Sequence, residues 1–473
     1  MKYISTRGRS TPLPFRETLL TGLAPDGGLF LPERYPDASP LLEEWQALSF
    51  SELFQQVVGL YVDGDIPEDD LRDLVRRSYE NFGHPEITPL VRVGGQWMLE
   101  LFHGPTLAFK DVALQFLGNA FEYVLAQSGR RLTVAGATSG DTGSAAIHAL
   151  RGKAGVDVFM LFPKGRVSPM QERQMTTVPD ANIHAVAVEG SFDDAQDIIK
   201  GLFNDRAFND RFSLGAVNSI NWGRVMAQVV YYFYAYFRLA AEGAISLGAT
   251  VRFSVPTGNF GNIFAGYAAR RMGLPVEKLI LATNANDILH HFIGSGIYRK
   301  GEVAETFSPS MDIQVASNFE RYLFELSGRN SAQLMQWMDA LRDEGGFQVN
   351  AELLQRVQAE FASVRADDQE TLSTIREVYE REGYLLDPHT AVGLRGAMAQ
   401  QEGGSPVISM ATAHPAKFAE AIKQAIGEEP ALPPALAGLE ALPERLTVLP
   451  ARLEAVRAFI GETLGEIPVK APG

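Results

Sequence analysis

Three stretches of this chain share one pattern, in which a short apolar run ends at a turn and an apolar stripe at helical spacing follows. The stretches lie at residues 97–124, 132–150 and 250–271. Two further apolar runs, at 156–163 and 183–188, have the length and composition of buried strands. Buried strands that alternate with helices favour a parallel sheet with helices packed on it, so the pattern predicts an α/β fold.

Lys110 stands at the turn of the first stretch, between the strand-like run and the helical stripe. Leu107, Phe109 and Leu114 surround it in the sequence, which places the lysine at the edge of a core. Burial there favours the neutral amine, a nucleophile that forms a Schiff base with a carbonyl or with pyridoxal phosphate. The alternative, which the residue alone leaves open, is a solvated lysine whose stem lies along apolar surface.

The other two stretches carry small and polar residues between strand and helix, where free backbone N–H groups converge on an anion. The loop of the second stretch suits an α-carboxylate and consists of Thr138, Ser139, Gly140, Asp141 and Thr142. The loop of the third stretch consists of Gly258, Asn259, Phe260, Gly261 and Asn262. Two glycines in five residues allow the backbone to approach a phosphate closely, and the helix dipole adds to the attraction. The spacing matches neither the dinucleotide fingerprint nor a Walker loop.

A long apolar helix is predicted at 225–239, with Asn221 as a candidate cap and Arg224 in its first turn. Arginine is unfavourable near the positive end of a helix dipole, so its position there indicates a shared anion such as a phosphate. A surface arginine is the alternative. His290 and His291 are adjacent and have no third ligand in view, so no metal site is predicted.

The composition excludes several classes of protein. The chain has 473 residues, a formal net charge of -15 and no cysteine. The negative charge disfavours a nucleic-acid partner, and the lack of cysteine excludes disulfides and thiolate metal sites. The longest apolar stretch contains Gln228 and Arg238 and is predicted to be a buried helix, not a membrane span. The first residues lack the apolar core of a signal peptide, so a cytoplasmic enzyme is expected.

The rest of the chain is predicted to be mostly structural. Helical patterns lie at 50–60, 67–82 and 333–382, and a terminal packing element is expected at 446–464. A buried strand is predicted at 407–411, immediately before Thr412.

Several motifs resemble those of the threonine synthase family, in the family's order and over nearly the whole chain. The segment HGPTLAFKD at 103–111 resembles the family's cofactor-lysine motif. The loops at 138–142 and 258–262 resemble the carboxylate-binding and phosphate-binding loops of fold type II pyridoxal phosphate enzymes. The segments NSINWGR at 218–224 and ATAHP at 411–415 resemble the family's substrate-phosphate segment and its ATGH phrase.

The resemblance implies an α/β fold of type II, similar to the tryptophan synthase beta chain. It implies an N-terminal, mainly helical domain at 1–95, a catalytic region of two α/β subdomains at 96–425, and a C-terminal packing segment at 426–473. The chain departs from the family at Asp141, where asparagine is usual, because an ionised aspartate accepts hydrogen bonds but donates none.

The resemblance also implies a role for each candidate residue. Lys110 would be the catalytic residue and would hold pyridoxal phosphate as a Schiff base. The implied cofactor-binding residues are Lys110, Asp141, Gly258, Asn259, Phe260, Gly261, Asn262 and Thr412, the last at the pyridine nitrogen. The implied substrate-binding residues are Thr138, Ser139, Gly140, Thr142, Asn218, Arg224 and Asn259, with Asn218 and Arg224 on the substrate phosphate.

The activity implied is the conversion of O-phospho-L-homoserine and water to L-threonine and phosphate, by a monomer or small homo-oligomer. One alternative is a phospholyase or a serine/threonine dehydratase that gives 2-oxobutyrate with the same cofactor. Another is a non-catalytic homologue that binds metabolites, against which the intact Lys110 and glycine loop argue. A nucleotide-binding oxidoreductase is disfavoured because the fingerprint is missing.

Overall fold

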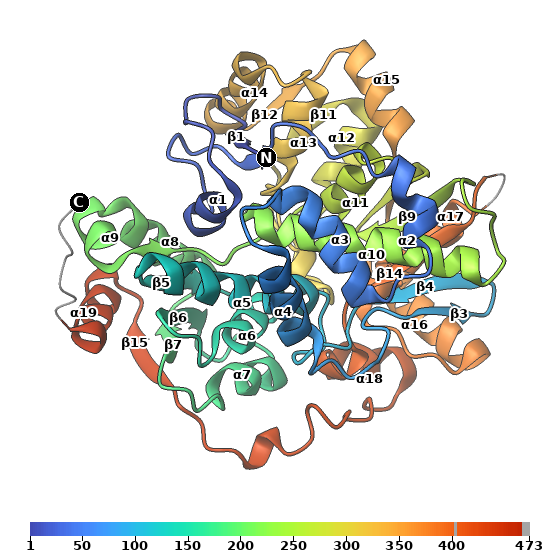
Figure 1. Cartoon of the computed structure of the whole chain (residues 1–473). Helices are drawn as coiled ribbons and strands as arrows, with labels where there is room; N and C mark the ends of the chain where they lie inside the picture. The colour runs from blue at the N-terminus through green and yellow to red at the C-terminus, as the bar shows by residue number, and fades with distance from the viewer. Residues whose placement is uncertain (402–403, 466–473) are drawn as a thin grey trace. The chain divides into compact units, whose positions relative to one another are not determined.

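A six-stranded sheet organises the larger of two compact units in this computed structural model, which describes residues 1–401 and 404–465 (Figure 1). This first unit comprises residues 1–113 and 219–431. Its strand order is β13-β10-β9-β14-β4-β3, and all neighbours are parallel except the edge pair β3 and β4. The bounds of these strands are β13 (Phe361–Arg365), β10 (Val276–Thr283), β9 (Val251–Pro256), β14 (Val407–Ala411), β4 (Gln96–Glu100) and β3 (Leu90–Val93).

Helices pack against this sheet and bury both of its central strands. Every residue of β9 and β14 is buried, which explains why these strands read as continuous apolar runs in the sequence. The helices of this unit are α1 (Phe15–Thr21), α2 (Leu42–Trp45), α3 (Phe50–Val62), α4 (Glu68–Tyr79), α10 (Trp222–Ala241), α11 (Gly261–Arg271), α12 (Ile288–Ser295), α13 (Phe319–Leu326), α14 (Ser331–Asp343), α15 (Ala351–Glu360), α16 (Asp368–Glu382), α17 (Pro388–Ala399) and α18 (Ala419–Ile426).

Short elements complete the first unit. They are the strand pairs β1 (Tyr3–Ser5) with β2 (Phe30–Pro32) and β11 (Ile297–Arg299) with β12 (Gly346–Gln348), and the 3₁₀ turns η1 (Ser39–Leu41), η2 (Pro309–Met311) and η3 (Pro415–Lys417). Both strand pairs are antiparallel.

The second unit comprises residues 114–218 and the described residues from 432 onward, and its five-stranded sheet is parallel throughout. The strand order is β15 (Thr447–Pro450), β7 (Ile183–Glu189), β6 (Val156–Pro163), β5 (Leu132–Ala137) and β8 (Leu214–Gly215). The remaining elements are α5 (Lys110–Ser128), which starts in the first unit, α6 (Asp141–Leu150), α7 (Pro169–Thr176), α8 (Phe192–Asn204), α9 (Arg206–Phe212), η4 (Leu439–Ala441) and α19 (Leu453–Leu464).

Most predicted elements are confirmed, and the α/β class and parallel sheets are among them. The long apolar helix is α10, and Asn221 caps it by accepting a hydrogen bond from the Gly223 N–H. The prediction of one helical stretch at 333–382 is wrong, because two strands interrupt it. The longer of these, β13, pairs in parallel with β10, so a place at the sheet edge overrides the helical pattern around it. The domain boundaries at 95 and 425 stay predictions.

Among the residues at 1–401 and 404–465, no helix is long and apolar enough to cross a membrane.

Helix α5 depends on a glycine for its close packing on α6. A Cβ added at Gly118 would overlap the backbone carbonyl oxygen of Ala149, which cannot move away as a flexible side chain can. This contact fixes the position of the helix that begins at Lys110.

We therefore expect Gly118→Ala to lower the free energy of unfolding by about 1–3 kcal/mol through overpacking. Gly59→Ala is the matched control, because Gly59 is also helical and its nearest neighbour to an added Cβ lies 4.0 Å away. That change should raise stability by about 0.5–1 kcal/mol. Urea denaturation of both variants measures the effect, and equal midpoints would contradict the close packing.

Candidate active site

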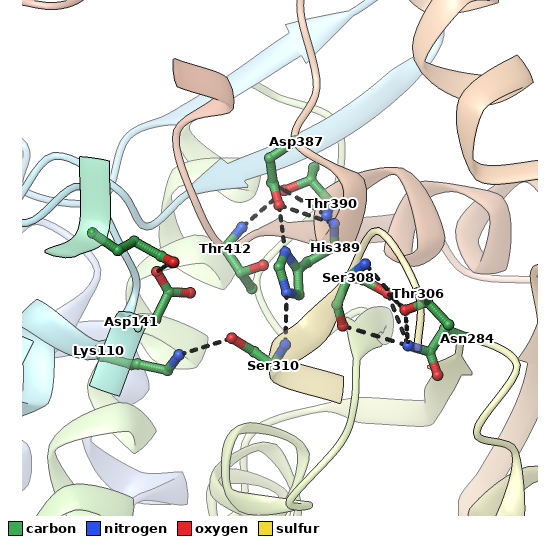
Figure 2. Close-up of polar contacts among 11 residues, drawn as sticks. Lys110, Asp141, Asn284, Thr306, Ser308, Ser310, Asp387, His389, Thr390 and Thr412 are labelled. Carbon is green, nitrogen blue, oxygen red and sulfur yellow. Dashed lines mark hydrogen bonds and ion pairs between the residues drawn. The ribbon is translucent and has the colours of Figure 1, made fainter. Parts of the chain in front are cut away.

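Lys110 lies beside Thr412 because their two backbone segments pair. The Phe109 N–H donates to the Thr412 carbonyl oxygen at 2.8 Å, and the His414 N–H donates to the Leu107 carbonyl oxygen at 3.0 Å. The Lys110 side chain is 7% exposed, and its Nζ donates to Ser310 Oγ at 3.3 Å (Figure 2). The predicted position of the lysine at the edge of a core is therefore confirmed.

Asp111 holds the turn that presents this lysine. Its fully buried carboxylate accepts hydrogen bonds from the Thr106 N–H at 2.8 Å and from Thr106 Oγ1 at 2.6 Å. The buried Lys417 donates to the Thr106 carbonyl oxygen at 2.8 Å, and burial raises the pKa of Asp111. The turn also holds Leu107 at a φ of 59°, in the left-handed region.

The glycine loop lies between β9 and α11. A Cβ at Gly258 would lie 2.9 Å from Met311 Cα and 3.0 Å from the Ser310 carbonyl oxygen, so this glycine admits the backbone of η2. Neither glycine of the loop is left-handed; instead, Phe260 has a φ of 62° and its ring packs in an aromatic cluster with Phe319. The first N–H groups of α11 have no intrahelical acceptor, as at the start of any helix, and the anion site predicted there stays a prediction.

Asn318 ties the glycine loop to the segment that leads into α10. Its N–H and its Nδ2 donate to the Asn259 carbonyl oxygen at 3.0 and 3.1 Å, and Nδ2 also donates to the Ser219 carbonyl oxygen at 3.0 Å. The Ser317 hydroxyl adds a bond to the Asn259 side chain at 3.1 Å. The starts of α10 and α11 are thus held together by one side chain.

Arg224 and Arg321 are both buried in this unit, but they differ in whether their donors are paired. Arg321 donates to the Phe30 carbonyl oxygen, to Asn318 Oδ1 and to the Ile220 carbonyl oxygen. Arg224 is 3% exposed, and its Nε and Nη1 have no hydrogen-bond partner. Burial lowers the pKa of Arg224 to about 10, so it stays charged at neutral pH. A buried, charged guanidinium with two unpaired donors is unfavourable in the folded chain unless a partner satisfies it.

Asn262 adds another unpaired donor in the first turn of α11. Its Oδ1 accepts hydrogen bonds from the Tyr231 and Tyr232 hydroxyls at 2.7 and 2.9 Å. These two bonds orient the amide, and its buried Nδ2 has no partner. Because Tyr231 and Tyr232 lie on α10, the packing of α10 on α11 fixes this donor. The first unit therefore offers unpaired donors on both helices.

The loop at 138–142 belongs to the second unit. Thr138 Oγ1 accepts from the Gly140 N–H at 3.0 Å and from the Gly143 N–H at 2.9 Å, so one backbone donor of the loop and one directly after it are already paired. Gly140 has a φ of 142°, and a Cβ there would overlap Gln171. The buried Asp141 accepts from Gln171 Nε2 at 2.8 Å, in agreement with its expected acceptor role.

The predicted site residues fall into two groups. In the first unit, hydrogen bonds hold the segment of Lys110 beside Thr412, and others hold the loop at 258–262 beside the segment that precedes Arg224. The loop at 138–142 and the exposed Asn218 belong to the second unit. Across residues 1–401 and 404–465, no three histidine, aspartate or glutamate side chains form a metal-binding group.

Sequence reasoning missed four residues that shape this site. Ser310, Asn318 and His389 each contact a residue far along the chain, whereas Asp387 contacts its near neighbours His389 and Thr390. A signal existed for Asp387 alone, since Asp-Pro-His-Thr has the form of a helix N-terminus.

Glu100 joins the same region to the segment between α16 and α17. It lies 2.7 Å from His103 Nε2 and accepts from the Tyr384 hydroxyl at 2.7 Å. Burial by itself raises the pKa of Glu100, but the hydrogen bonds from His103 and Tyr384 outweigh it, and the pKa is lowered.

Family models match nearly the whole chain. "Threonine synthase N terminus" matches residues 2–79, "Pyridoxal-phosphate dependent enzyme" matches 84–412, and "Threonine synthase, C-terminal" matches 390–460. The chain is 49% identical to the threonine synthase of Pseudomonas aeruginosa over 98% of both chains.

Solved structures agree with the family models. A pyridoxal-phosphate-bound threonine synthase from Brucella melitensis has a TM-score of 0.94 and 49% identity, over 98% of this chain and 99% of that one. Yeast threonine synthase has a TM-score of 0.93 and 45% identity, over 98% and 99% of the two chains. The predicted fold type II architecture is confirmed.

The lowered pKa of Glu100 makes stability depend on pH. The ionised carboxylate stabilises the folded state above the ordinary glutamate pKa, and this contribution is lost as pH falls through the lowered pKa. Glu100→Gln should cost about 1.5–3 kcal/mol at pH 7, and the difference from the parent should shrink as the pH falls toward 3. Tyr384→Phe removes one of the hydrogen-bond donors to Glu100, so it should lower the free energy of unfolding by less than Glu100→Gln does. Urea denaturation at a series of pH values measures both, and a difference that is constant with pH would contradict the assignment.

Proposed function

We propose that this chain, which belongs to the threonine synthase family, converts O-phospho-L-homoserine and water to L-threonine and phosphate with pyridoxal phosphate as cofactor. One observation supports this substrate class most directly: the unpaired, buried Arg224 lies on a helix joined by Asn318 to the glycine loop. A single phosphate, that of the cofactor, needs one anion site. A phosphorylated substrate needs a second.

The residues of the first unit fit pyridoxal phosphate. The buried Lys110 supplies the amine that holds the cofactor's carbonyl carbon, and the loop at 258–262 with the start of α11 supplies N–H donors for the cofactor phosphate. Thr412 follows β14 and offers a neutral hydroxyl to the pyridine nitrogen, which leaves that nitrogen largely unprotonated. Asp141 is proposed as a further cofactor contact, as an acceptor.

The substrate's two acidic groups are assigned to different loops. Thr138, Ser139, Gly140 and Thr142 are proposed to bind the α-carboxylate. The Gly140 N–H of that loop and the Gly143 N–H directly after it already donate to Thr138, so the carboxylate would rely on the loop's other N–H groups and hydroxyls. Asn218, Arg224 and Asn259 are proposed to bind the substrate phosphate.

Bound pyridoxal phosphate supplies an electron sink at the carbon that carries the substrate's amine. The freed Lys110 amine moves protons at Cα and Cβ, so that phosphate leaves from Cγ. It returns one proton at Cγ, the hydroxyl of water adds at Cβ, and the remaining proton goes back to Cα. Burial suits this role because a neutral amine both accepts and returns protons. Arg224 holds the phosphate before and after the C–O bond breaks, and it neutralises the charge of the leaving group.

A phospholyase that gives 2-oxobutyrate is the second candidate, because it would use the same lysine and the same arginine. Product analysis separates the two functions: a lyase releases keto acid and ammonia, and the proposed enzyme releases threonine. Four points stay predictions of this proposal. They are the identity of the substrate, a cytoplasmic location, assembly as a monomer or small homo-oligomer, and the lack of a nucleic-acid partner.

Lys110 is expected to be essential. Lys110→Ala should lower threonine formation from O-phospho-L-homoserine by at least roughly 10²–10⁴-fold, the contribution of a positioned acid–base group. Borohydride reduction of the parent protein, followed by peptide mapping, should place the cofactor on Lys110. Lys423→Ala changes an exposed lysine paired with Glu429 and should keep full activity. A cofactor adduct on another lysine would refute the assignment.

Arg224 is expected to lower the stability of the folded protein and to be needed for activity. Arg224→Met should lower kcat/KM by about 10–100-fold, because charge-assisted hydrogen bonds to the phosphate are lost. The same change should raise the free energy of unfolding without ligand, because it removes an unpaired buried charge.

Arg321→Met is the matched control for this trade. Arg321 is equally buried but fully paired, so its replacement leaves acceptors unsatisfied and should lower stability. Activity assays and urea denaturation of both variants provide the comparison. If Arg224→Met destabilised the protein as much as Arg321→Met does, Arg224 would be structural.

A further inference from the structure

Ser310, His389 and Asp387 lie together, but they do not form a hydrolytic triad. His389 Nδ1 lies 2.9 Å from Asp387 Oδ1, and His389 Nε2 accepts from the backbone N–H of Ser310 at 3.3 Å (Figure 2). In a nucleophilic triad, the histidine would contact the serine hydroxyl. Here the hydroxyl contacts Lys110 instead. Because an amide N–H separates the histidine from that hydroxyl, the arrangement fixes position and does not pass a proton to Lys110.

The hydrogen bonds fix the tautomer of His389. Asp387 Oδ1 already accepts from the His389 N–H at 2.9 Å, and as a carboxylate oxygen it can only accept from the ring as well. Nδ1 therefore carries the proton, and Nε2 is left as the acceptor that Ser310 requires. The ring is buried and packs against Phe418 with 4.9 Å between ring centroids.

The second oxygen of the same carboxylate reaches Thr412. Asp387 Oδ2 accepts from the Thr390 N–H at 3.2 Å and from the Thr390 hydroxyl. The Thr390 hydroxyl oxygen in turn accepts from the Thr412 N–H at 3.0 Å. Because the hydroxyl has a single proton and gives it to Asp387, its orientation toward Thr412 is determined.

The segment that carries Ser310 is held from its other side as well. Asn284 Nδ2 lies 2.7–2.9 Å from side-chain oxygens of Thr306, Ser308 and Asp312, and its two N–H bonds are shared among them. His389 also accepts a hydrogen bond from the backbone N–H of Ser310. Because η2 is held from both sides, the Ser310 hydroxyl stays within reach of Lys110.

We propose that Asp387 and His389 are positioning residues, through which one buried carboxylate sets both the Ser310 contact to Lys110 and the backbone of Thr412. One arm runs through His389 and Ser310, and the other runs through Thr390. The inference rests on the proposed function in that Lys110 and Thr412 are taken as the cofactor's contacts. It assigns a role to the Asp-Pro-His-Thr segment at 387–390 beyond that of a helix cap.

Asp387→Asn tests both arms at once. Asparagine caps helices about as well as aspartate. Its NH2 group replaces one carboxylate oxygen, however, and would then face a hydrogen-bond donor, either on the His389 arm or on the Thr390 arm. In the holoenzyme we expect the visible absorption band of the cofactor to shift and kcat to fall on the order of 10²-fold, with a smaller change in KM. Asp367→Asn makes the same change at the cap of α16 and should alter neither. An unchanged band and kcat in Asp387→Asn would overturn the proposal.

Substitutions at Thr390 and His389 separate the arms, and they decide the question even if Asp387→Asn fails to fold. Thr390→Val keeps the shape without the hydroxyl and should shift the band, whereas Thr390→Ser should restore it. His389→Gln keeps an acceptor for the Ser310 N–H and should retain more kcat than His389→Leu. Equal behaviour within each pair would refute the role of that hydrogen bond.

The same measurements distinguish a failure of this inference from a failure of the proposed function. If the parent protein bound pyridoxal phosphate but formed no threonine from O-phospho-L-homoserine, the proposed function would fail. The absorption bands of the Thr390 and Asp387 variants would still test the positioning role.

Discussion

The convergence of three parallel strands is the constraint on which the site depends. Strands β9, β14 and β4 are neighbours in one sheet, so their carboxyl ends meet at one edge. After β9 comes the loop at 258–262, after β14 comes Thr412, and after β4 comes the segment that leads to Lys110. Ligands of open α/β sheets bind at such an edge. The backbone bond from Phe109 to Thr412 then joins two of these segments directly.

The buried polar groups of this region are of two kinds: those whose hydrogen bonds are satisfied within the chain, and those that keep unpaired donors. Arg321 and Asp111 are buried with their partners in place, so they stabilise the folded chain without need of a ligand. Arg224 and Asn262 keep donors without partners, which costs stability of about 1–3 kcal/mol for each unsatisfied group. A folded protein tolerates that cost where a ligand offsets it. The distinction is the observation on which the proposed phosphate contact of Arg224 rests.

The sequence predicts those features that depend on local pattern. Lys110, the glycine loop and the cap at Asn221 each lie at the junction of a strand or loop with a helix, and such junctions are visible in apolar spacing and turn residues. The strand β13 was missed because its place is set by pairing with β10, some 80 residues earlier in the chain. Ser310 and Asn318 were missed for the same reason: nothing in the residues beside them indicates which distant backbone they contact.

Three residues of this region share a physical property, which explains their part in the site. Asn318 bonds to the carbonyl oxygens of Ser219 and Asn259, His389 bonds to the N–H of Ser310, and Gly258 gives room to the backbone of η2. Each acts on main-chain atoms, so it fixes a segment and leaves that segment's side chain available. A reactive amine needs such a framework, because the group that moves protons must be held in place without its own nitrogen being committed to permanent bonds. Sites of this kind are therefore specified as much by contacts to the backbone as by the residues that perform the chemistry.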